Sequence, residues 1–191
     1  MKTEELRIRN MVSSRCITAV RQMLKSLDMT ELERISLGKV VVGYEDERQL
    51  AQFIDALPSI GFALVEDEGQ QTVEMIKVAA IELFYHGNNA NSLIRNSDHL
   101  SERTGMPYHQ LSRVFSEQTG TTLEKYIILL KIERVKELLS YKDLTLSEIS
   151  YQMGYSSVQY LSNQFKQVTD VTPKQFKEGK GGGRIPLDRL I

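Results

Sequence analysis

The sequence of 191 residues has almost no cysteine, because Cys16 is the only one. A single thiol excludes an internal disulfide framework and is typical of a chain that works in a reducing compartment such as the cytoplasm. Long hydrophobic runs are also absent, since a run such as 126–130 is far too short to span a bilayer. No apolar segment follows the charged N-terminal residues, so the sequence predicts neither a signal peptide nor a membrane partner.

Signatures of catalysis are missing as well. The sequence contains no glycine-rich dinucleotide loop, no P-loop and no His-Glu-x-x-His motif, and its one cysteine has no histidine at a suggestive spacing. These absences argue against a small enzyme. We therefore predict no catalytic residue and no cofactor.

The charge is distributed unevenly along the chain. Residues 1–89 hold 10 Lys/Arg and 14 Asp/Glu, a balance of −4, whereas residues 90–191 hold 14 and 11, a balance of +3. A basic half indicates a polyanionic partner for that half. Solvated helix faces can produce the same imbalance, so charge alone leaves the partner open.

The C-terminal half contains an internal repeat. Leu100-Ser101 and Gly105 recur 49 positions later as Ile149-Ser150 and Gly154. After one inserted residue the offset becomes 50, and the matching pairs are Leu111 with Leu161, Ser112 with Ser162, Phe115 with Phe165, Thr119 with Thr169, Thr122 with Thr172 and Tyr126 with Phe176. An ordered series of this kind indicates a duplicated segment.

Each copy has the pattern of helix, tight turn and helix. Gly105 and Gly154 supply the positive φ of the turns, and Thr145 with Glu148 forms a capping box at the start of the second copy. The pattern predicts two helix-turn-helix motifs, whose second helices turn their outer faces to the DNA major groove. Residues 123–143 predict one long amphipathic helix, capped by Thr122, that holds the two reading helices about 34 Å apart.

The outer faces of the two reading helices carry polar groups that can read bases. Candidates for base contacts are His109, Ser112 and Arg113 on the first helix and Val158, Gln159, Ser162 and Asn163 on the second. Arginine can grip guanine, glutamine and asparagine can bond adenine, and valine suits the thymine methyl group. Candidates for phosphate contacts are Lys131, Lys136, Lys166 and the helix caps Thr122 and Thr172. The alternative is a solvated polar helix face.

These residues carry a resemblance to a known family. Residues 73–176 resemble the DNA-binding domain of the AraC family of bacterial transcription regulators, through the motifs at 149–155, 160–166 and 169–176. The resemblance implies a sequence-specific regulator whose partners are double-stranded DNA and RNA polymerase. The chain departs from the family pattern at Asp170, Pro107 and Asn163, which predicts a different target sequence. We expect this all-α domain to cover 70–178, followed by a tail at 179–191.

The N-terminal part, residues 1–69, alternates between strand and helix periodicity. A strand around Leu6, a helix from Ile17, a hairpin of 32–37 with 40–42, a helix from Leu50 and a strand at 62–65 give the order βαββαβ. This order predicts a ferredoxin-like domain, so that the whole chain belongs to the α+β class. A further helix over 71–85 leads into the DNA-binding region, and the polar stretch 86–92 is a loop inside that region.

The loop at residues 10–16 resembles the metal-binding loop of the heavy-metal-associated domains of copper chaperones. Met11 and Cys16 match that motif, but Ser13 replaces its first cysteine. One thiolate cannot supply the two that Cu(I) requires, so we predict no metal site. A metal sensor or metallochaperone acting through this domain is the alternative function. Without metal, we expect the domain to form a homodimer or to contact another protein.

Overall fold

The computed structural model describes residues 1–86, 96–141 and 143–191. The chain divides into two compact units, Met1–Val78 and Ala79–Ile191. Most of the loop expected at 86–92 lies outside the described residues. In the part of the chain that is described, no helix combines the length and apolar composition needed to cross a bilayer.

The N-terminal unit has the predicted order of strands and helices. Its elements are β1 (Lys2–Arg9), α1 (Ser14–Ser26), β2 (Thr30–Glu31), β3 (Lys39–Tyr44), α2 (Glu47–Ala56), the 3-10 helix η1 (Leu57–Ile60) and β4 (Ala63–Leu64). The sheet order is β2-β3-β1-β4, and every neighbouring pair is antiparallel. This is a split βαβ arrangement, in which β3 lies between β1 and β2. The predicted α+β class is confirmed.

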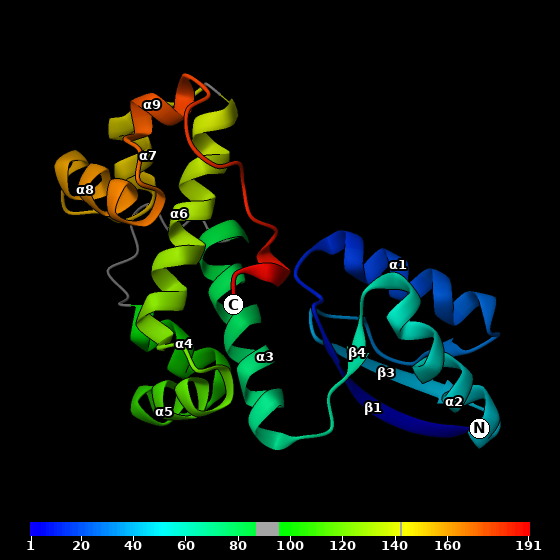
Figure 1. The fold of residues 1–191 in the computed structure, drawn as a ribbon. Coiled ribbons are helices and arrows are strands. Elements are labelled where there is room, and N and C mark those ends of the chain that lie inside the picture. The colour runs from blue at the N-terminus through cyan, green and yellow to red at the C-terminus, as the bar shows by residue number, and fades with distance from the viewer. Residues whose placement is uncertain (87–95, 142) are drawn as a thin grey trace. The chain divides into compact units, whose positions relative to one another are not determined.

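The core of this unit lies between the sheet and its two helices. Alternate residues of β1, Leu6 and Ile8, point to the helices, as do Val40 and Val42 of β3. The facing residues are Val20 and Leu24 of α1 and Leu50 and Phe53 of α2. Figure 1 shows both helices on one face of the sheet. Burying each large apolar side chain contributes about 1.5–3 kcal/mol.

The prediction of a hairpin strand at 32–37 is wrong. The strand that pairs with β3 is β2, which is only two residues long and ends at Glu31. Glu31 is fixed at the end of β2 by an ion pair with Arg21 of 2.7 Å. The Glu31 carboxylate also accepts the N–H of Ile35 at 3.3 Å. Ile35 is buried in the core from a loop, so its apolar side chain needs no strand.

The helix expected over 71–85 is α3 (Glu68–Ile81), which continues as a π-helical turn, η2 (Glu82–His86). The two compact units divide at Val78, within α3, whereas the sequence places the boundary at residue 69. The first turns of α3 belong to the N-terminal unit because the buried carboxylate of Glu74 accepts the N–H of Asn10 at 3.3 Å.

The C-terminal unit is helical. After α3 come α4 (Asn96–Thr104), α5 (Tyr108–Thr119), α6 (Leu123–Tyr141), α7 (Leu146–Gln152), α8 (Val158–Thr169), α9 (Pro173–Lys177) and the 3-10 helix η4 (Leu187–Arg189). The long helix α6 is the predicted spacer, and α5, α7, α8 and α9 all pack against it. The buried stripe expected for it is confirmed, with Tyr126, Ile127, Leu130, Val135, Leu138 and Leu139 all buried.

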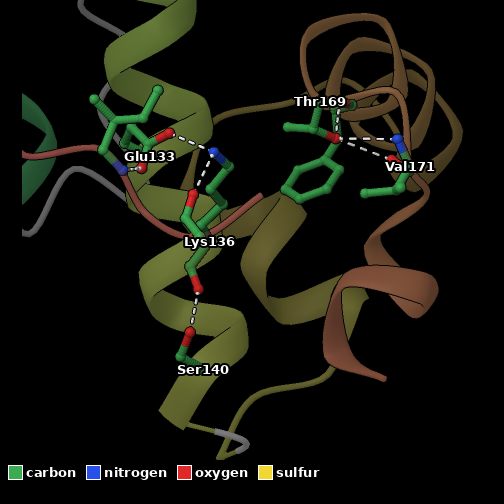
Figure 2. Close-up of polar contacts among 8 residues, drawn as sticks. Glu133, Lys136, Ser140, Thr169 and Val171 are labelled. Carbon is green, nitrogen blue, oxygen red and sulfur yellow. Dashed lines mark hydrogen bonds and ion pairs between the residues drawn. The ribbon is translucent and has the colours of Figure 1, made fainter. Parts of the chain in front are cut away.

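The internal repeat is visible in the contacts as well as in the sequence. Thr119 Oγ1 donates to the carbonyl of Phe115 at 2.7 Å and accepts the N–H of Thr121 at 3.2 Å. Thr169 Oγ1 makes the matching bonds to Phe165, at 2.8 Å, and to Val171, at 3.4 Å (Figure 2). Thr119 and Thr169 are the last residues of α5 and α8, which correspond to the two predicted reading helices. Each of these helices thus ends with the same side-chain cap.

The turns have the backbone geometry that the sequence predicts. Gly105 and Gly154 have φ of 71° and 65°, in the left-handed region that glycine adopts without strain. Asp170 has φ of 61° at the end of α8, in the left-handed region that aspartate tolerates. The capping box of Thr145 and Glu148 is present at the start of α7.

Substituting Gly154 tests the backbone requirement of the second turn. A Cβ at this position meets no atom within 4 Å, so only the positive φ of 65° opposes a side chain. We expect Gly154→Val to lower the melting temperature of the C-terminal unit and to abolish DNA binding, because a β-branched residue is strained at positive φ. Gly154→Asn, the matched control, should lose much less of both. Equal losses in thermal melts of the two variants would show that crowding, not φ, is the constraint.

Candidate nucleic-acid interface

Helices α5 and α8 each bury one face and expose the other. Leu111 and Phe115 of α5 and Leu161 and Phe165 of α8 are completely buried against the rest of the unit. Figure 1 shows α5 below the lower end of α6 and α8 beside its upper half. A helix of 19 residues such as α6 is about 28 Å long. A helix of this length is long enough to hold two packed helices apart on the scale of one turn of B-DNA, about 34 Å.

The exposed face of α5 contains the residues that the sequence singled out. His109 and Arg113 are exposed, and Ser112 is half-buried. Arg113 Nε lies 3.8 Å from the Glu117 carboxylate, and both side chains are largely in water. Such a solvated pair contributes little to stability, so the guanidinium is free to exchange its partner. Gln110 is also exposed, next to His109. It was not among the predicted base contacts, although its spacing of three residues from Arg113 indicates the same helix face.

The exposed face of α8 has two amides that are joined to each other. Gln159 Nε2 donates to Asn163 Oδ1 at 2.8 Å, and both side chains are exposed. Each amide keeps further donor or acceptor capacity for a base edge. Val158 and Ser162 lie half-buried on the same helix. The bond orders two long polar side chains before any ligand arrives, which lowers the entropy cost of binding.

Helix α8 is fixed by residues just before it. Ser157 caps its start by accepting the N–H of Tyr160 at 3.1 Å. The buried Tyr155 donates its hydroxyl to Gln164 at 2.7 Å, and its ring packs on the exposed Tyr160 at 5.9 Å between centroids. This cap was not predicted, although a serine just before a helical run of apolar residues is a usual capping signal.

Three of the phosphate-contact candidates lie at accessible positions. Lys166 is exposed near the end of α8. Thr122 Oγ1 accepts the N–H of Lys125 at 3.2 Å at the start of α6, and Thr172 forms a capping box with Gln175 at the start of α9. Ordered helix starts favour anions through N–H groups that are still free. At the start of α9 the capping box uses the N–H groups of Thr172 and Gln175, and Pro173 has none, so the start of α6 is the better site.

The structure contradicts the phosphate contact predicted for Lys136. Its side chain is buried, and its ammonium pairs with the equally buried Glu133 at 2.6 Å (Figure 2). The same ammonium donates to the carbonyl of Gly183 at 3.3 Å, and the N–H of Ile185 donates to Glu133 at 2.8 Å. The segment after α9 is thus held to α6 by a buried ion pair.

The structure places Lys131, another predicted phosphate contact, beside two aromatic rings. Its ammonium lies 4.1 Å from the ring centroid of Tyr155 and 5.7 Å from that of Phe84. No carboxylate within the described ranges pairs with it, and burial lowers the pKa of this lysine to about 8. Lys131 therefore acts as a half-buried cation between two aromatic rings that offset part of its desolvation.

The loop at residues 10–16 brings Cys16 and Ser13 together. Cys16 Sγ lies 3.4 Å from Ser13 Oγ and 3.8 Å from the carbonyl of Asn10. Across residues 1–86, 96–141 and 143–191, no group of three or more His, Cys, Asp or Glu side chains could hold a metal ion. The donors beside Cys16 are hard oxygens, which suit soft metals poorly.

Comparison with known proteins matches residues 100–179 to a family described as a helix-turn-helix domain. The xylose operon regulatory protein of Escherichia coli (strain K12) is 23% identical over 174 residues, a match that covers 85% of this chain and 44% of that protein. An uncharacterised HTH-type transcriptional regulator of Staphylococcus aureus (strain MSSA476) is 34% identical over 97 residues, covering 51% of this chain and 12% of that protein. The chain therefore spans less than half the length of these curated relatives.

Solved structures give similar matches over the C-terminal part. The C-terminal domain of the two-component response regulator yesN from Fusobacterium nucleatum is 28% identical, covers 55% of this chain and 95% of that domain, and has a TM-score of 0.46. The DNA-binding domain of AdpA, solved in complex with a target DNA, is 17% identical, covers 55% of this chain and 91% of that domain, and has a TM-score of 0.45.

Replacing Lys131 by methionine tests the role of the aromatic site. The pKa of Lys131 is about 8 in the folded chain, below its ordinary value of 10.5, so the unfolded chain binds more protons between these values. Stability of the wild type should therefore rise with pH above 8, and Lys131→Met should lack this rise. The difference between urea midpoints of the two proteins from pH 7 to 9.5 measures the effect. Unchanged pH dependence, or a loss of DNA affinity, would contradict the assignment.

Replacing Lys136 by methionine tests the buried pair. The change leaves the Glu133 carboxylate buried without its cation, so we expect a loss of about 3–5 kcal/mol in the free energy of unfolding. The double variant Glu133→Leu/Lys136→Met should recover much of this loss, because it removes both charges. Urea unfolding measures stability, and DNA affinity is compared where each variant is folded. If Lys136→Met were as stable as the wild type but bound DNA more weakly, Lys136 would be a phosphate contact as the sequence predicted.

Proposed function

We propose that this protein belongs to the AraC family of transcription regulators, which its match to a helix-turn-helix domain over residues 100–179 and its similarity to the xylose operon regulatory protein support. It regulates transcription by binding a specific DNA duplex through two adjacent major-groove segments. This family consists of regulators, not enzymes. The observation that carries the proposal is the pair of exposed, polar helix faces, on α5 and α8, held by one rigid helix.

The bases are read by the side chains on these two faces. On α5, Arg113 would bond guanine O6 and N7, with His109 and Ser112 beside it. On α8, Gln159 and Asn163 would read adenine or another base edge, while Val158 and Ser162 make closer contacts. Their exposure and the bond of 2.8 Å between the two amides support this assignment. Because the two faces differ, the half-sites should not be identical.

Phosphates are contacted from the helix ends around these faces. Lys166 supplies a positive charge at the end of α8, and the starts of α6 and α9 at Thr122 and Thr172 supply ordered N–H groups. Contacts of this kind fix the register of the protein on the duplex but carry no sequence information. They make the binding weaken steeply as salt rises.

The regulatory step requires partners besides DNA. RNA polymerase is the partner that a regulator bound beside a promoter would contact. The N-terminal unit supplies the surface for a homodimer or for another protein, since its sheet and helices form a complete core of their own. A regulator that binds DNA and contacts RNA polymerase acts where the bacterial chromosome lies, in the cytoplasm.

Selection from random duplexes tests the proposal and yields the site. We expect a bipartite motif with two protected major-groove segments one helical turn apart, and a single protected segment in methylation interference would contradict it. Arg113→Ala should cost about 1–3 kcal/mol and relax the preference at one base pair. Lys166→Ala should weaken all sequences alike and reduce the salt slope by about one. Arg48→Ala, on the exposed surface of α2, is the control and should change neither.

A further inference from the structure

Strand β1 is paired along its length on one side but only partly on the other. Its register with β3 runs from Lys2, opposite Tyr44, to Arg7, opposite Lys39. Its register with β4 includes only Ile8 and Arg9. Figure 1 shows β1 continuing beyond the end of β4. The first half of β1, from Lys2 to Leu6, is therefore an edge of the sheet on the β4 side.

The direction of the main-chain groups along this edge follows from two hydrogen bonds. The N–H of Ile8 donates to Gly38 at 3.0 Å, on the β3 side, and the N–H of Val65 donates to Arg7 at 2.9 Å, on the β4 side. Alternate residues of a strand turn these groups to opposite sides. Thr3 and Glu5 therefore turn their N–H and C=O groups to the open edge, where no described strand pairs with them.

A groove adjoins this edge because β4 ends early. Gln71 Nε2 donates to the carbonyl of Val65 at 3.0 Å and to that of Glu66 at 3.4 Å, and the chain turns away into α3. The resulting space of about 340 Å³ is lined by residues 4–7 of β1, residues 64–66 and Gln71. It lies within the N-terminal unit, in line with the direction that β4 would have followed.

The charges at this edge determine which kind of strand could bind there. Glu5 is paired with Arg7 and Lys39, and Lys39 also lies 4.0 Å from Glu33. Lys2 is paired with Glu47, so these charges balance one another. Glu4 and Glu66 are exposed and have no ion-pair partner in the described chain. The uncompensated charge is negative, so a strand that bears lysine or arginine is favoured and an acidic strand is repelled.

A second copy of this strand fits the edge less well than a basic segment. An antiparallel, two-fold pairing that sets Thr3 opposite Glu5 of the other copy also sets Glu4 opposite Glu4. Like charges directly opposite each other destabilise a strand pair. The pairing that sets Thr3 opposite Thr3 offers Glu4 only Lys2, which is already paired with Glu47. Charged edges of this kind are a usual protection against self-association.

We propose that the Lys2–Leu6 edge of β1 binds an extended lysine- or arginine-rich segment of another protein, which adds to the sheet as a fifth strand antiparallel to β1. The four main-chain groups of Thr3 and Glu5 supply the affinity, and the carboxylates of Glu4 and Glu66 supply the preference for basic side chains. This interaction is separate from the proposed DNA binding, because it uses only residues of the N-terminal unit.

Amide hydrogen exchange of the full chain tests the strand addition. The probe is an acetylated and amidated hexapeptide, Thr-Lys-Val-Lys-Thr-Lys, with Thr-Glu-Val-Glu-Thr-Glu as its charge-reversed control. We expect the basic peptide to slow exchange of the Thr3 and Glu5 amides about tenfold or more, while the Glu4 and Leu6 amides, already bonded to β3, change little. Binding without protection of Thr3 and Glu5 would overturn the proposal, as would no binding.

Matched variants separate the main-chain and charge contributions. Thr3→Pro removes one outward N–H and should weaken peptide binding about fivefold, whereas Thr3→Val keeps that N–H and should not. Glu4→Lys/Glu66→Lys should abolish binding, and Glu45→Lys/Asp55→Lys, which changes the net charge equally elsewhere in the unit, should preserve it. Affinity for the selected DNA should stay the same in Thr3→Pro and Thr3→Val. If the wild type alone sediments as a dimer that Thr3→Pro dissociates, a second copy occupies the edge and the proposal is wrong.

Discussion

The placement of both reading helices depends on one aromatic contact that occurs twice. The ring of Phe115 packs on Tyr126 at 5.1 Å, and the ring of Phe165 packs on Phe176 at 5.7 Å. Each contact fixes the rotation of a reading helix about its own axis, and a shift of one residue along a helix turns a side chain by about 100°. The polar outer faces can meet DNA in register only because the inner faces are fixed in this way.

Helix α6 is the common element against which both reading helices, α5 and α8, pack. Helices α5, α7, α8 and α9 and the π-helical turn η2 pack around it, so that charged residues as well as apolar ones become buried on its surface. Glu133 and Lys136 neutralise each other, and the main chain at 183–185 satisfies their remaining hydrogen-bonding capacity. A buried ion pair seldom adds net stability. Its effect here is to tie the segment after α9 to the centre of the unit, so that the tail is part of the fold.

These contacts explain which features the sequence could predict. Turns, caps, the duplication and the order βαββαβ arise from local patterns, and the structure reproduces them. The burial of Lys136 and the aromatic surroundings of Lys131 were not predicted, because an amphipathic pattern assumes one buried face, whereas α6 is covered on several. The partners of these lysines, Tyr155 and Gly183, lie far along the sequence, and no local signal links them. The two-residue strand β2 was misplaced because so short a strand has no periodicity to detect.

The distribution of charge lets one chain serve two proposed partners without competition between them. Phosphates are attracted to the basic C-terminal half and repelled by the carboxylates of the first half, of which Glu4 and Glu66 have no ion-pair partner in the described chain. A lysine-rich segment has the opposite preference. DNA is therefore repelled by the β1 edge as well as attracted to the C-terminal half, and the basic segment has the reverse preference. Because both interactions are electrostatic, higher salt would weaken this discrimination together with the binding itself.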